Sequence, residues 1–336
     1  MKFRQGIALW QAWAALGALA ALGSALAALG SAPAAAQPFP SKPLRIIVPF
    51  GPGTGTDILA RVVGERIGEQ FGVGVVVENR EGAGGLLGAT ATANSAADGY
   101  TLMMAANPLV VAPLLQAAPA YSAVRDFAPI ARIGVLPMAL VTGPAAPYAS
   151  VREMIAFARA NPGRLNYASS GKGTPSHLEM ELIAQSAGLK LQDIPYKSTA
   201  QAMTDTIGGQ VALYFSTLPP ALAQMRAAKL RILGIGSPRR LAQAQEIPTL
   251  AEALGQPGYE ANVWYGLVAP AGTPPEILTR LADAVSRALE HAPVRERVEK
   301  SGTEIDAAGP DVFAAQIRRE SDKWSALVKS LGLGAN

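Results

Sequence analysis

The clearest pattern along the chain is a short apolar run followed by a glycine-rich turn and a periodic helix. The run Ile46–Val48 has the length and β-branched character of a buried strand. Beyond the turn at 51–57, apolar residues recur at helical spacing, at Leu59, Val62, Val63, Ile67 and Phe71. A strand, a glycine-rich loop and a helix N-terminus leave backbone N–H groups free and direct a positive dipole end at one point. The stretch 45–67 therefore predicts an anion site, and we expect it to hold a carboxylate.

The next hundred residues continue the alternation of strands and helices. A second β-branched run lies at 73–79, the glycines of 82–85 lead into an Ala/Leu-rich helix, and a strand is predicted at Tyr100–Ala105. This β-α-β-α-β order is typical of an open parallel sheet with helices on both faces. Two further strands are predicted at Ile130–Ile133 and Met138–Thr142.

A second set of alternating elements follows, over about 143–260. Ser150 predicts the start of a helix. The stretch 165–190 then repeats the opening order, with a short strand, a glycine turn and a helix that has Thr174 at its N-cap and Pro175 at its first position. Gly188 ends that helix. The pattern continues with a strand at 191–197, a helix through Ala202–Ile207 and strands at Val211–Phe215 and 232–236.

The C-terminal part predicts one more strand, at WYGLVAPAGTP, and two helices. The first helix spans Pro275–Glu290 and follows Pro274, and the closing helix spans Ala314–Ser330, with Trp324 and Leu327 on its apolar face. The chain as a whole therefore predicts an α/β protein built from two sets of parallel strands and helices.

The first 36 residues have the pattern of a secretory signal peptide. Lys2 and Arg4 form a basic start, an apolar Ala/Leu-rich run follows, and the small residues 34–36 fit a cleavage site after Ala36. The apolar run at 7–29 is long enough to span a membrane, so an uncleaved anchor is the alternative. No later segment approaches a comparable apolar length.

Composition and charge narrow the class of protein. The 336 residues are 49% hydrophobic and 16% charged, which is typical of a globular protein. Cleavage removes Lys2 and Arg4 and no acidic residue, so the net charge falls from +4 to +2, too small an excess to favour nucleic acid as a partner. The absence of cysteine excludes disulfides and thiolate metal sites, and is consistent with a bacterial periplasm.

The sequence does not match the common motifs of enzymes and cofactor-binding proteins, because the required residues do not occur at the required spacing. Gly53 and Gly55 are followed by Ile58, where a dinucleotide-binding fingerprint needs Gly or Ala, and Lys172 is followed by Gly173 in place of the Ser or Thr of a phosphate-binding P-loop. No G-x-S-x-G motif occurs. The chain has only two histidines, which makes a catalytic dyad or a zinc site improbable.

Several polar residues permit both a structural and a functional interpretation. His177 falls in the first turn of a predicted helix, where capping or packing is favoured over ligand binding. Asp57 also lies in a first helical turn, where it either complements the dipole or contacts a ligand, and Asp205 is similarly ambiguous. Tyr196 and Lys197 end a strand beside the expected cleft, so either could face an anion.

Eight sequence blocks, spread in order over nearly all of the chain after the leader, resemble one family, the Bug or TctC-like extracytoplasmic receptors. The blocks are FGPGTGTD, EGAGGLLGA, DGYTL, ANPGRLNYASSGKGTPSHL, IPYK, GGQV, IPTLAEALGQPGYE and WYGLVAPAGTP. The resemblance implies a type II periplasmic-binding-protein fold, in which two α/β lobes joined by crossing strands close on a ligand. Lobe 1 would comprise 37–141 and 261–336, and lobe 2 would comprise 142–260. It also implies a small organic acid as ligand and the membrane subunits of a tripartite tricarboxylate transporter as partners.

The resemblance also assigns ligand-binding residues in both lobes. The carboxylate-holding loop of lobe 1 falls on Gly53, Thr54, Gly55, Thr56 and Asp57. The loop of lobe 2 falls on Ser169, Gly171, Gly173 and Thr174, with His177 matching a family histidine. Three positions depart from the family pattern: Thr54 and Ser198 stand where glycine is usual, and Ala112 stands where asparagine is usual.

We therefore expect a monomeric periplasmic receptor for a carboxylate, without catalysis, metal or cofactor. The candidate ligand-binding residues outside the two loops are Tyr196, Lys197 and Asp205. Two alternatives remain at this point: a secreted hydrolase or isomerase on the same fold, and a ligand sensor for a signalling kinase.

Overall fold

The structure is a computed structural model that describes residues 39–334. The signal peptide predicted at 1–36 lies outside the described residues. From Lys42 onward the chain folds as one compact unit, in which strands and helices alternate as the sequence pattern predicts. The described residues include no helix that is both long enough and apolar enough to cross a membrane.

The first sheet begins with three parallel strands in the order β2-β1-β3. They are β1 (Leu44–Val48), β2 (Val75–Asn79) and β3 (Thr101–Ala106). The helices α2 (Gly55–Phe71) and α3 (Leu86–Ala93) connect them. β1 and β3 are almost completely buried, as their uninterrupted apolar sequences require in a parallel sheet. The predicted β-α-β-α-β unit is confirmed.

The first sheet is completed by strands that come from later in the chain. β9 (Asn262–Pro270) pairs antiparallel with β3 and with β4 (Phe127–Thr142), and β10 (Glu304–Ala308) pairs antiparallel with β4. Residues far apart in the sequence therefore share one sheet.

The prediction of two separate strands at 130–133 and 138–142 is wrong, because β4 is one strand of 16 residues. Its pairing with β9 shifts register between Pro129 and Ala131 and again between Arg132 and Gly134. These two bulges lie at Pro129 and Gly134, which interrupt the sequence pattern. Pro137 stays within the strand, opposite Asn262.

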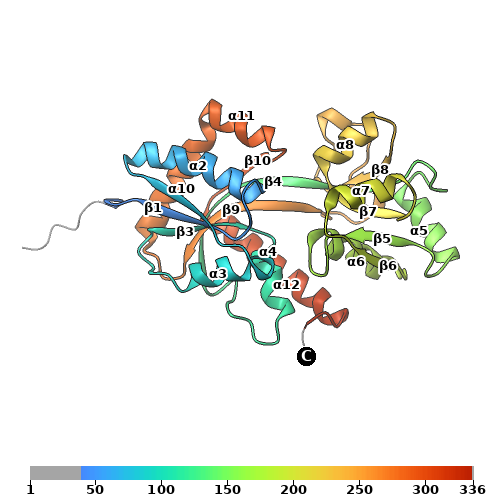
Figure 1. Cartoon of the computed structure of the whole chain (residues 1–336), viewed down its shortest axis with the longest axis horizontal. Coiled ribbons are helices and arrows are strands. Elements are labelled where there is room, and N and C mark those ends of the chain that lie inside the picture. Colours follow the sequence, from blue (N-terminus) through green and yellow to red (C-terminus); the bar gives the residue numbers. More distant parts are fainter. Residues whose placement is uncertain (1–38, 335–336) are drawn as a thin grey trace, which may run out of the picture. The chain divides into compact units, whose positions relative to one another are not determined.

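The second sheet is built on the C-terminal half of β4. The strand order is β4-β7-β5-β6, and β8 also pairs with β4. β5 (Asn166–Ser169) is parallel to β6 (Gln192–Pro195) and to β7 (Leu213–Thr217), whereas β7 and β8 (Arg231–Ile235) are antiparallel to β4. Because β4 belongs to both sheets, it joins them covalently, with β9 beside it (Figure 1).

Three helices of the second part lie close to the predicted residues: α5 (Val151–Ala160), α6 (Pro175–Ala187) and α7 (Thr199–Ile207). Two more, α8 (Leu218–Arg226) and α9 (Leu250–Leu254), were not predicted. The Ser150 side chain accepts a hydrogen bond from the Glu153 N–H at 3.2 Å, which confirms the predicted N-cap.

The C-terminal helices agree with the sequence pattern only in part. α10 (Pro275–Glu290) has the predicted bounds, but α12 (Pro310–Ser330) begins four residues before the predicted start at Ala314. α11 (Ala292–Lys300) and β10 were not predicted, because α11 is short and mostly charged and β10 is largely exposed.

Each of the two sheets has its own buried apolar clusters. One cluster packs against the first sheet and includes Trp264 and Phe313, whose ring centroids lie 5.3 Å apart in an edge-to-face arrangement. Two clusters cover the two faces of the second sheet, one around Tyr167 and Phe215 and the other around Tyr214. Each sheet therefore has apolar packing of its own. The lobe boundaries given above stay a prediction.

Candidate functional site

The loop between β1 and α2 turns its threonine hydroxyl away from the helix. Gly53 has a φ of 82°, a left-handed conformation that favours glycine, and Thr54 follows as the N-cap residue of α2. The Thr54 hydroxyl donates to the Gly51 carbonyl at 2.8 Å and makes no cap to its own helix. The described hydrogen bonds include none from the first-turn N–H groups of Gly55 and Thr56. These N–H groups are available to an anion.

Asp57 holds this loop in shape. Its carboxylate accepts hydrogen bonds from the Gly53 N–H at 3.0 Å, from the Arg61 guanidinium at 2.9 Å and from the Asn79 amide at 2.9 Å. The hydrogen bond from Arg61, followed by those from Gly53 and Asn79, lowers the pKa of Asp57 to about 2 despite its burial. Asp57 thus stabilises the conformation of the loop, and its contact with a ligand stays a prediction.

The loop between β5 and α6 reproduces the same geometry. Gly173 has a φ of 78°, and the Thr174 hydroxyl donates to the Gly171 carbonyl at 2.6 Å. Thr174 was predicted as an N-cap, and its backbone occupies that position, but its side chain does not cap α6. The Ser176 hydroxyl lies 3.2 Å from that of Thr174, as the Thr56 hydroxyl lies 3.1 Å from that of Thr54.

The two loops therefore form an internal repeat with the pattern G-x-G-T-x-[ST], at 51–56 and 171–176. Thr54 has φ and ψ of −72° and 161°, and Thr174 has −74° and 157°. The order of strand, glycine turn and helix is evident from the hydrophobic pattern, whereas the six-residue repeat becomes visible only when the two turns are aligned on their threonines.

The second loop carries additional internal hydrogen bonds. The Ser169 hydroxyl accepts from the Gly171 N–H at 3.1 Å, and the Ser176 hydroxyl accepts from the Ser170 N–H at 3.0 Å. Ser169, predicted as a ligand-binding residue, is completely buried beneath the loop. Ser169 therefore stabilises the loop through the hydrogen bond that its hydroxyl accepts from Gly171.

Among the predicted site residues, Thr174 lines the cavity described next, and the others, including those of the first loop, are not part of its lining. His177 is buried, its ring faces that of Tyr167 at a centroid distance of 6.3 Å, and its Nε2 lies 4.0 Å from Asp193. Burial lowers the pKa of His177. The Tyr196 hydroxyl donates to Asp205 at 2.9 Å, so these two predicted residues contact each other. Lys197 is exposed.

A cavity of about 780 Å³, here called the loop cavity, lies beside the second loop. Ser170, Thr174 and Ser176 line it from the loop, and Phe50, which precedes the first loop, lines it from the first sheet. Its other walls are mainly apolar and include Met138, Met203, Tyr214, Phe215 and Val263. These residues cannot be identified from the sequence pattern, because an apolar side chain that faces a cavity has the same periodicity as one that faces the core.

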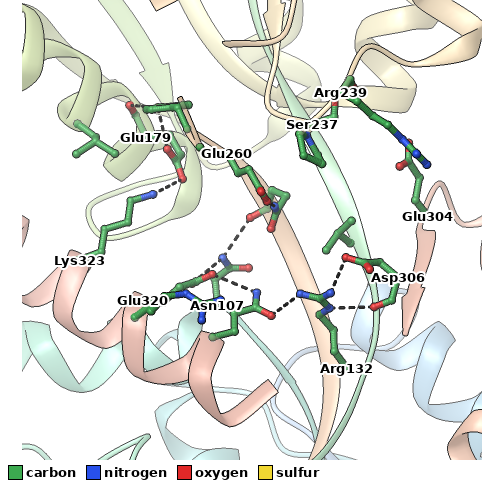
Figure 2. Close-up of a pocket in the computed structure, with 18 of the residues that line it drawn as sticks. Asn107, Arg132, Glu179, Ser237, Arg239, Glu260, Glu304, Asp306, Glu320 and Lys323 are labelled. Atoms are coloured by element: carbon green, nitrogen blue, oxygen red, sulfur yellow. Dashed lines mark hydrogen bonds and ion pairs between the residues drawn. The ribbon is translucent and has the colours of Figure 1, made fainter. Parts of the chain in front are cut away.

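A second cavity of about 790 Å³, here called the charged cavity, lies on the opposite side of the crossing strands (Figure 2). Neighbouring residues of β9 separate the two spaces, because Val263 lines the loop cavity and Asn262 lines the charged cavity. Four of the nine charged side chains that line it form two ion pairs. Arg132 binds Asp306 at 2.7 Å, and the Lys323 Nζ lies 3.5 Å from the Glu179 carboxylate.

Glu320 and Glu179 anchor this network. Glu320 accepts hydrogen bonds from the indole N–H groups of Trp264 at 2.9 Å and Trp324 at 3.3 Å. Glu179 accepts one from the Tyr259 hydroxyl at 2.9 Å, and burial raises the pKa of its carboxyl although Lys323 opposes the shift. Because its principal charges are already paired, we interpret the charged cavity as a support for the crossing strands and the loop cavity as the candidate ligand site.

No group of three or more potential metal ligands occurs among the described residues. The loop cavity offers an anion the hydroxyl groups and the helix N-terminus of the second loop, beside apolar walls. The first loop follows Phe50, which lines the cavity, but residues 51–57 themselves do not line it.

Comparison with known proteins gives the family. The model of the tripartite tricarboxylate transporter family receptor matches residues 59–333. The chain belongs to this receptor family. Protein BugT of Bordetella pertussis is 37% identical over 300 residues, which cover 89% of this chain and 92% of BugT.

Solved structures agree with this assignment. The periplasmic binding protein BugD is 30% identical with a TM-score of 0.70, over 89% of this chain and all of BugD. R. palustris Rpa4515, solved with adipate, is 31% identical with a TM-score of 0.72, over 88% of this chain and 98% of Rpa4515. The predicted α/β periplasmic-binding-protein fold is confirmed, and with it the predicted relation to the Bug and TctC proteins.

The first prediction from this geometry concerns Asp57. We expect Asp57→Asn to lower the free energy of unfolding by about 1–2 kcal/mol at pH 7, a range reduced because the Arg61 side chain is half exposed. The folded-state pKa of about 2 lies below the ordinary 3.8, so this stabilisation is complete above pH 3.8 and is lost as the pH falls toward 2. Urea titrations between pH 7 and 2.5 measure the difference.

The matched control is Asp322→Asn, since Asp322 is exposed on α12 and has no hydrogen bond or ion pair with the described residues. Equal losses in both variants, or a loss for Asp57→Asn that is independent of pH, would contradict the role given to Asp57.

The second prediction concerns the buried pair in the charged cavity. Removing Lys323 leaves the Glu179 carboxylate buried without its cation, so Lys323→Met should cost about 2 kcal/mol near neutral pH. Burial raises the folded-state pKa of Glu179 above its ordinary 4.5, and loss of Lys323 raises it further. The carboxyl is then protonated in the folded state at acidic pH, and the difference from wild type should shrink as the pH falls.

Thermal unfolding at pH 7.5 and pH 4.5 measures this change, with Lys329→Met at the exposed end of the same helix as control. If the stability difference between wild type and Lys323→Met is larger at pH 4.5 than at pH 7.5, Lys323 does not stabilise the ionised carboxylate of Glu179.

Proposed function

We propose that this receptor binds a small organic acid in the loop cavity, between its two lobes, and delivers it to the membrane subunits of a tripartite tricarboxylate transporter. The observation that carries the proposal is the pair of matched loops. Each loop ends at a helix N-terminus whose threonine hydroxyl is turned back toward a glycine carbonyl. Such termini attract a carboxylate through free N–H groups and the helix dipole.

The site would bind the carboxylate with neutral donors. Ser170, Thr174 and Ser176 present hydroxyl groups to the cavity, and Lys229 is the one charged residue among the described residues that line it. Lys229 is itself exposed. A carboxylate held by several charge-assisted hydrogen bonds, each contributing about 1.5–3 kcal/mol, reaches micromolar affinity without a salt bridge.

The remainder of the ligand would pack against apolar side chains. Met138, Met203 and Phe215 offer no partner to a second charge, and an unpaired charge placed against them loses its hydration. Adipate, present in the structure of Rpa4515, has an apolar chain that suits such walls. It carries a carboxylate at each end, and in the proposed site the two helix N-termini would supply a donor set for each. The cavity volume of about 780 Å³ lies in the usual range for small-molecule sites.

We place the lobe boundaries at the strands that cross between the sheets, with 37–141 and 261–336 in lobe 1 and 142–260 in lobe 2. This division is supported by β4, which pairs with β9 in the first sheet and with β7 in the second. A ligand that contacts loops of both lobes would select a closed arrangement by a hinge motion about these strands.

The receptor would act as a periplasmic monomer, exported by a signal peptide that is cleaved after Ala36, and without catalysis. Of its two histidines, His177 is buried away from the loop cavity and His291 precedes α11. The serines that line the cavity therefore have no imidazole base beside them.

The third prediction tests the function and the class of ligand. Residues 37–336 are titrated by calorimetry and thermal shift with malate, citrate, glutamate, adipate and benzoate. We expect one of the acids with an apolar body, adipate or benzoate, to bind more tightly than citrate. At a hundred times its Kd it should stabilise the fold by about 2.7 kcal/mol, a shift of several degrees.

Binding of none of the five acids would overturn the proposed function. Tighter binding of citrate than of adipate and benzoate would show that the apolar walls do not select the ligand.

The fourth prediction concerns the second loop. Thr174→Val removes the hydroxyl that lines the cavity and fixes Gly171, so we expect about five- to tenfold weaker binding of the best acid. The control is Thr279→Val, because the Thr279 hydroxyl makes a similar backward hydrogen bond, to the Pro275 carbonyl at 2.9 Å, on the exposed surface of α10. Equal affinity of the two variants for the acid would show that the Thr174 hydroxyl does not contribute to ligand binding.

A further inference from the structure

Tyr265 lies on a crossing strand beside the loop cavity. Side chains alternate along β9, so Val263 and Tyr265 face one side and Trp264 faces the other. Val263 lines the loop cavity, and Trp264 packs on Phe313 in the core. Tyr265 therefore points to the side of the sheet on which α2 begins.

The Tyr265 hydroxyl lies at the N-terminus of α2. A Cβ built on Gly55, the first residue of α2, would be 2.5 Å from this hydroxyl. The glycine at position 55 is therefore what lets the phenol reach the helix terminus. The hydroxyl and the first-turn N–H groups of Gly55 and Thr56 are close enough to bind the same anion.

The Tyr265 side chain is largely buried, and its hydroxyl has no hydrogen-bond partner among the described residues. Tyr265 exposes 7% of its surface, and the described residues provide no hydrogen bond to it. Burial raises the pKa of Tyr265 to about 12, so the phenol stays protonated and can donate at neutral pH. A donor on a largely buried side chain that no described protein group uses is available to a bound molecule.

The other buried tyrosines make this one unusual. Tyr259 and Tyr167 donate to carboxylates, and Tyr214, which lines the loop cavity, has the Ser170 side chain as partner. Within the described chain, Tyr121 is the tyrosine whose hydroxyl oxygen is itself buried without a partner, and it lies in a separate apolar pocket.

We propose that Tyr265 is a further ligand-positioning residue, whose hydroxyl donates a hydrogen bond to a ligand carboxylate oxygen held at the N-terminus of α2. This inference rests on the proposed carboxylate-binding function and adds a donor that neither loop supplies. The carboxylate would receive N–H bonds from the helix on one side and the phenol O–H on the other. The N–H groups and the positive dipole end at this helix terminus favour an acceptor oxygen over an ammonium group, and the phenol adds a further donor to that oxygen.

The test compares Tyr265→Phe, Tyr121→Phe and wild type by calorimetry with malate, citrate, glutamate, adipate and benzoate. Tyr265→Phe removes one oxygen and keeps the ring. We expect the Kd of the best acid to rise about five- to tenfold, while the melting temperature of the ligand-free protein stays equal or rises. Tyr121→Phe also removes a hydroxyl without a partner, and its Kd should equal that of wild type.

A second measurement separates contact from an indirect effect. The methyl ester of the best acid lacks the carboxylate charge and binds more weakly. If the phenol touches that carboxylate, Tyr265→Phe should weaken the ester by less than twofold although it weakens the acid. For an acid with two carboxylates, each monoester is tested in turn.

Each outcome decides a different claim. Binding of an acid with the same Kd in wild type and Tyr265→Phe would overturn the role of Tyr265 and leave the proposed function intact. An equal loss for acid and ester would show that the hydroxyl acts only on the shape of the site, which also overturns the proposal. If the wild-type protein binds none of the five acids, both the proposed function and this inference are wrong.

Discussion

The candidate site depends on the direction of two threonine hydroxyls. A threonine at a helix N-cap usually accepts a hydrogen bond from its own first turn and thereby uses one of the free N–H groups. Here Thr54 and Thr174 instead donate backward to Gly51 and Gly171. This backward hydrogen bond stabilises each loop and leaves the N–H groups of the helix N-terminus free to bind an anion. The glycine before each threonine adopts the left-handed conformation that this turn requires.

The two cavities show how the same strands can carry two kinds of chemistry. On one side of β4 and β9, carboxylates and cations pair with one another, so the charged cavity is largely satisfied by the protein. On the other side the donors are neutral and the walls apolar. Charges that would compete with a ligand are thus kept on the opposite side of the crossing strands, where they hold α12 against the second part of the chain through Lys323 and Glu179.

Much of this arrangement could be predicted from the sequence, and the failures have identifiable causes. The two loops, the helices they open and the α/β order follow from local patterns, such as the β-branched run before Gly51 and the Thr174-Pro175 helix start. The continuity of β4 through Pro137 could not be predicted, because it depends on pairing with β9 more than 120 residues later. The hidden position of His177 and the contact between Tyr265 and Gly55 also depend on tertiary packing, which leaves no periodic signal in the sequence.

The near-identity of the two loops has a consequence for how affinity would be set. In the proposed closure, an acid captured at one helix terminus meets the second as an intramolecular event, so the second contact is governed by an effective concentration. That concentration depends on how easily β4 and β9 bend and on the contacts that oppose bending. A substitution in the crossing strands could therefore retune affinity over a wide range while every ligand-contacting residue stays the same. Related receptors with the same two loops would then differ in ligand strength through their hinges as well as through their cavity walls.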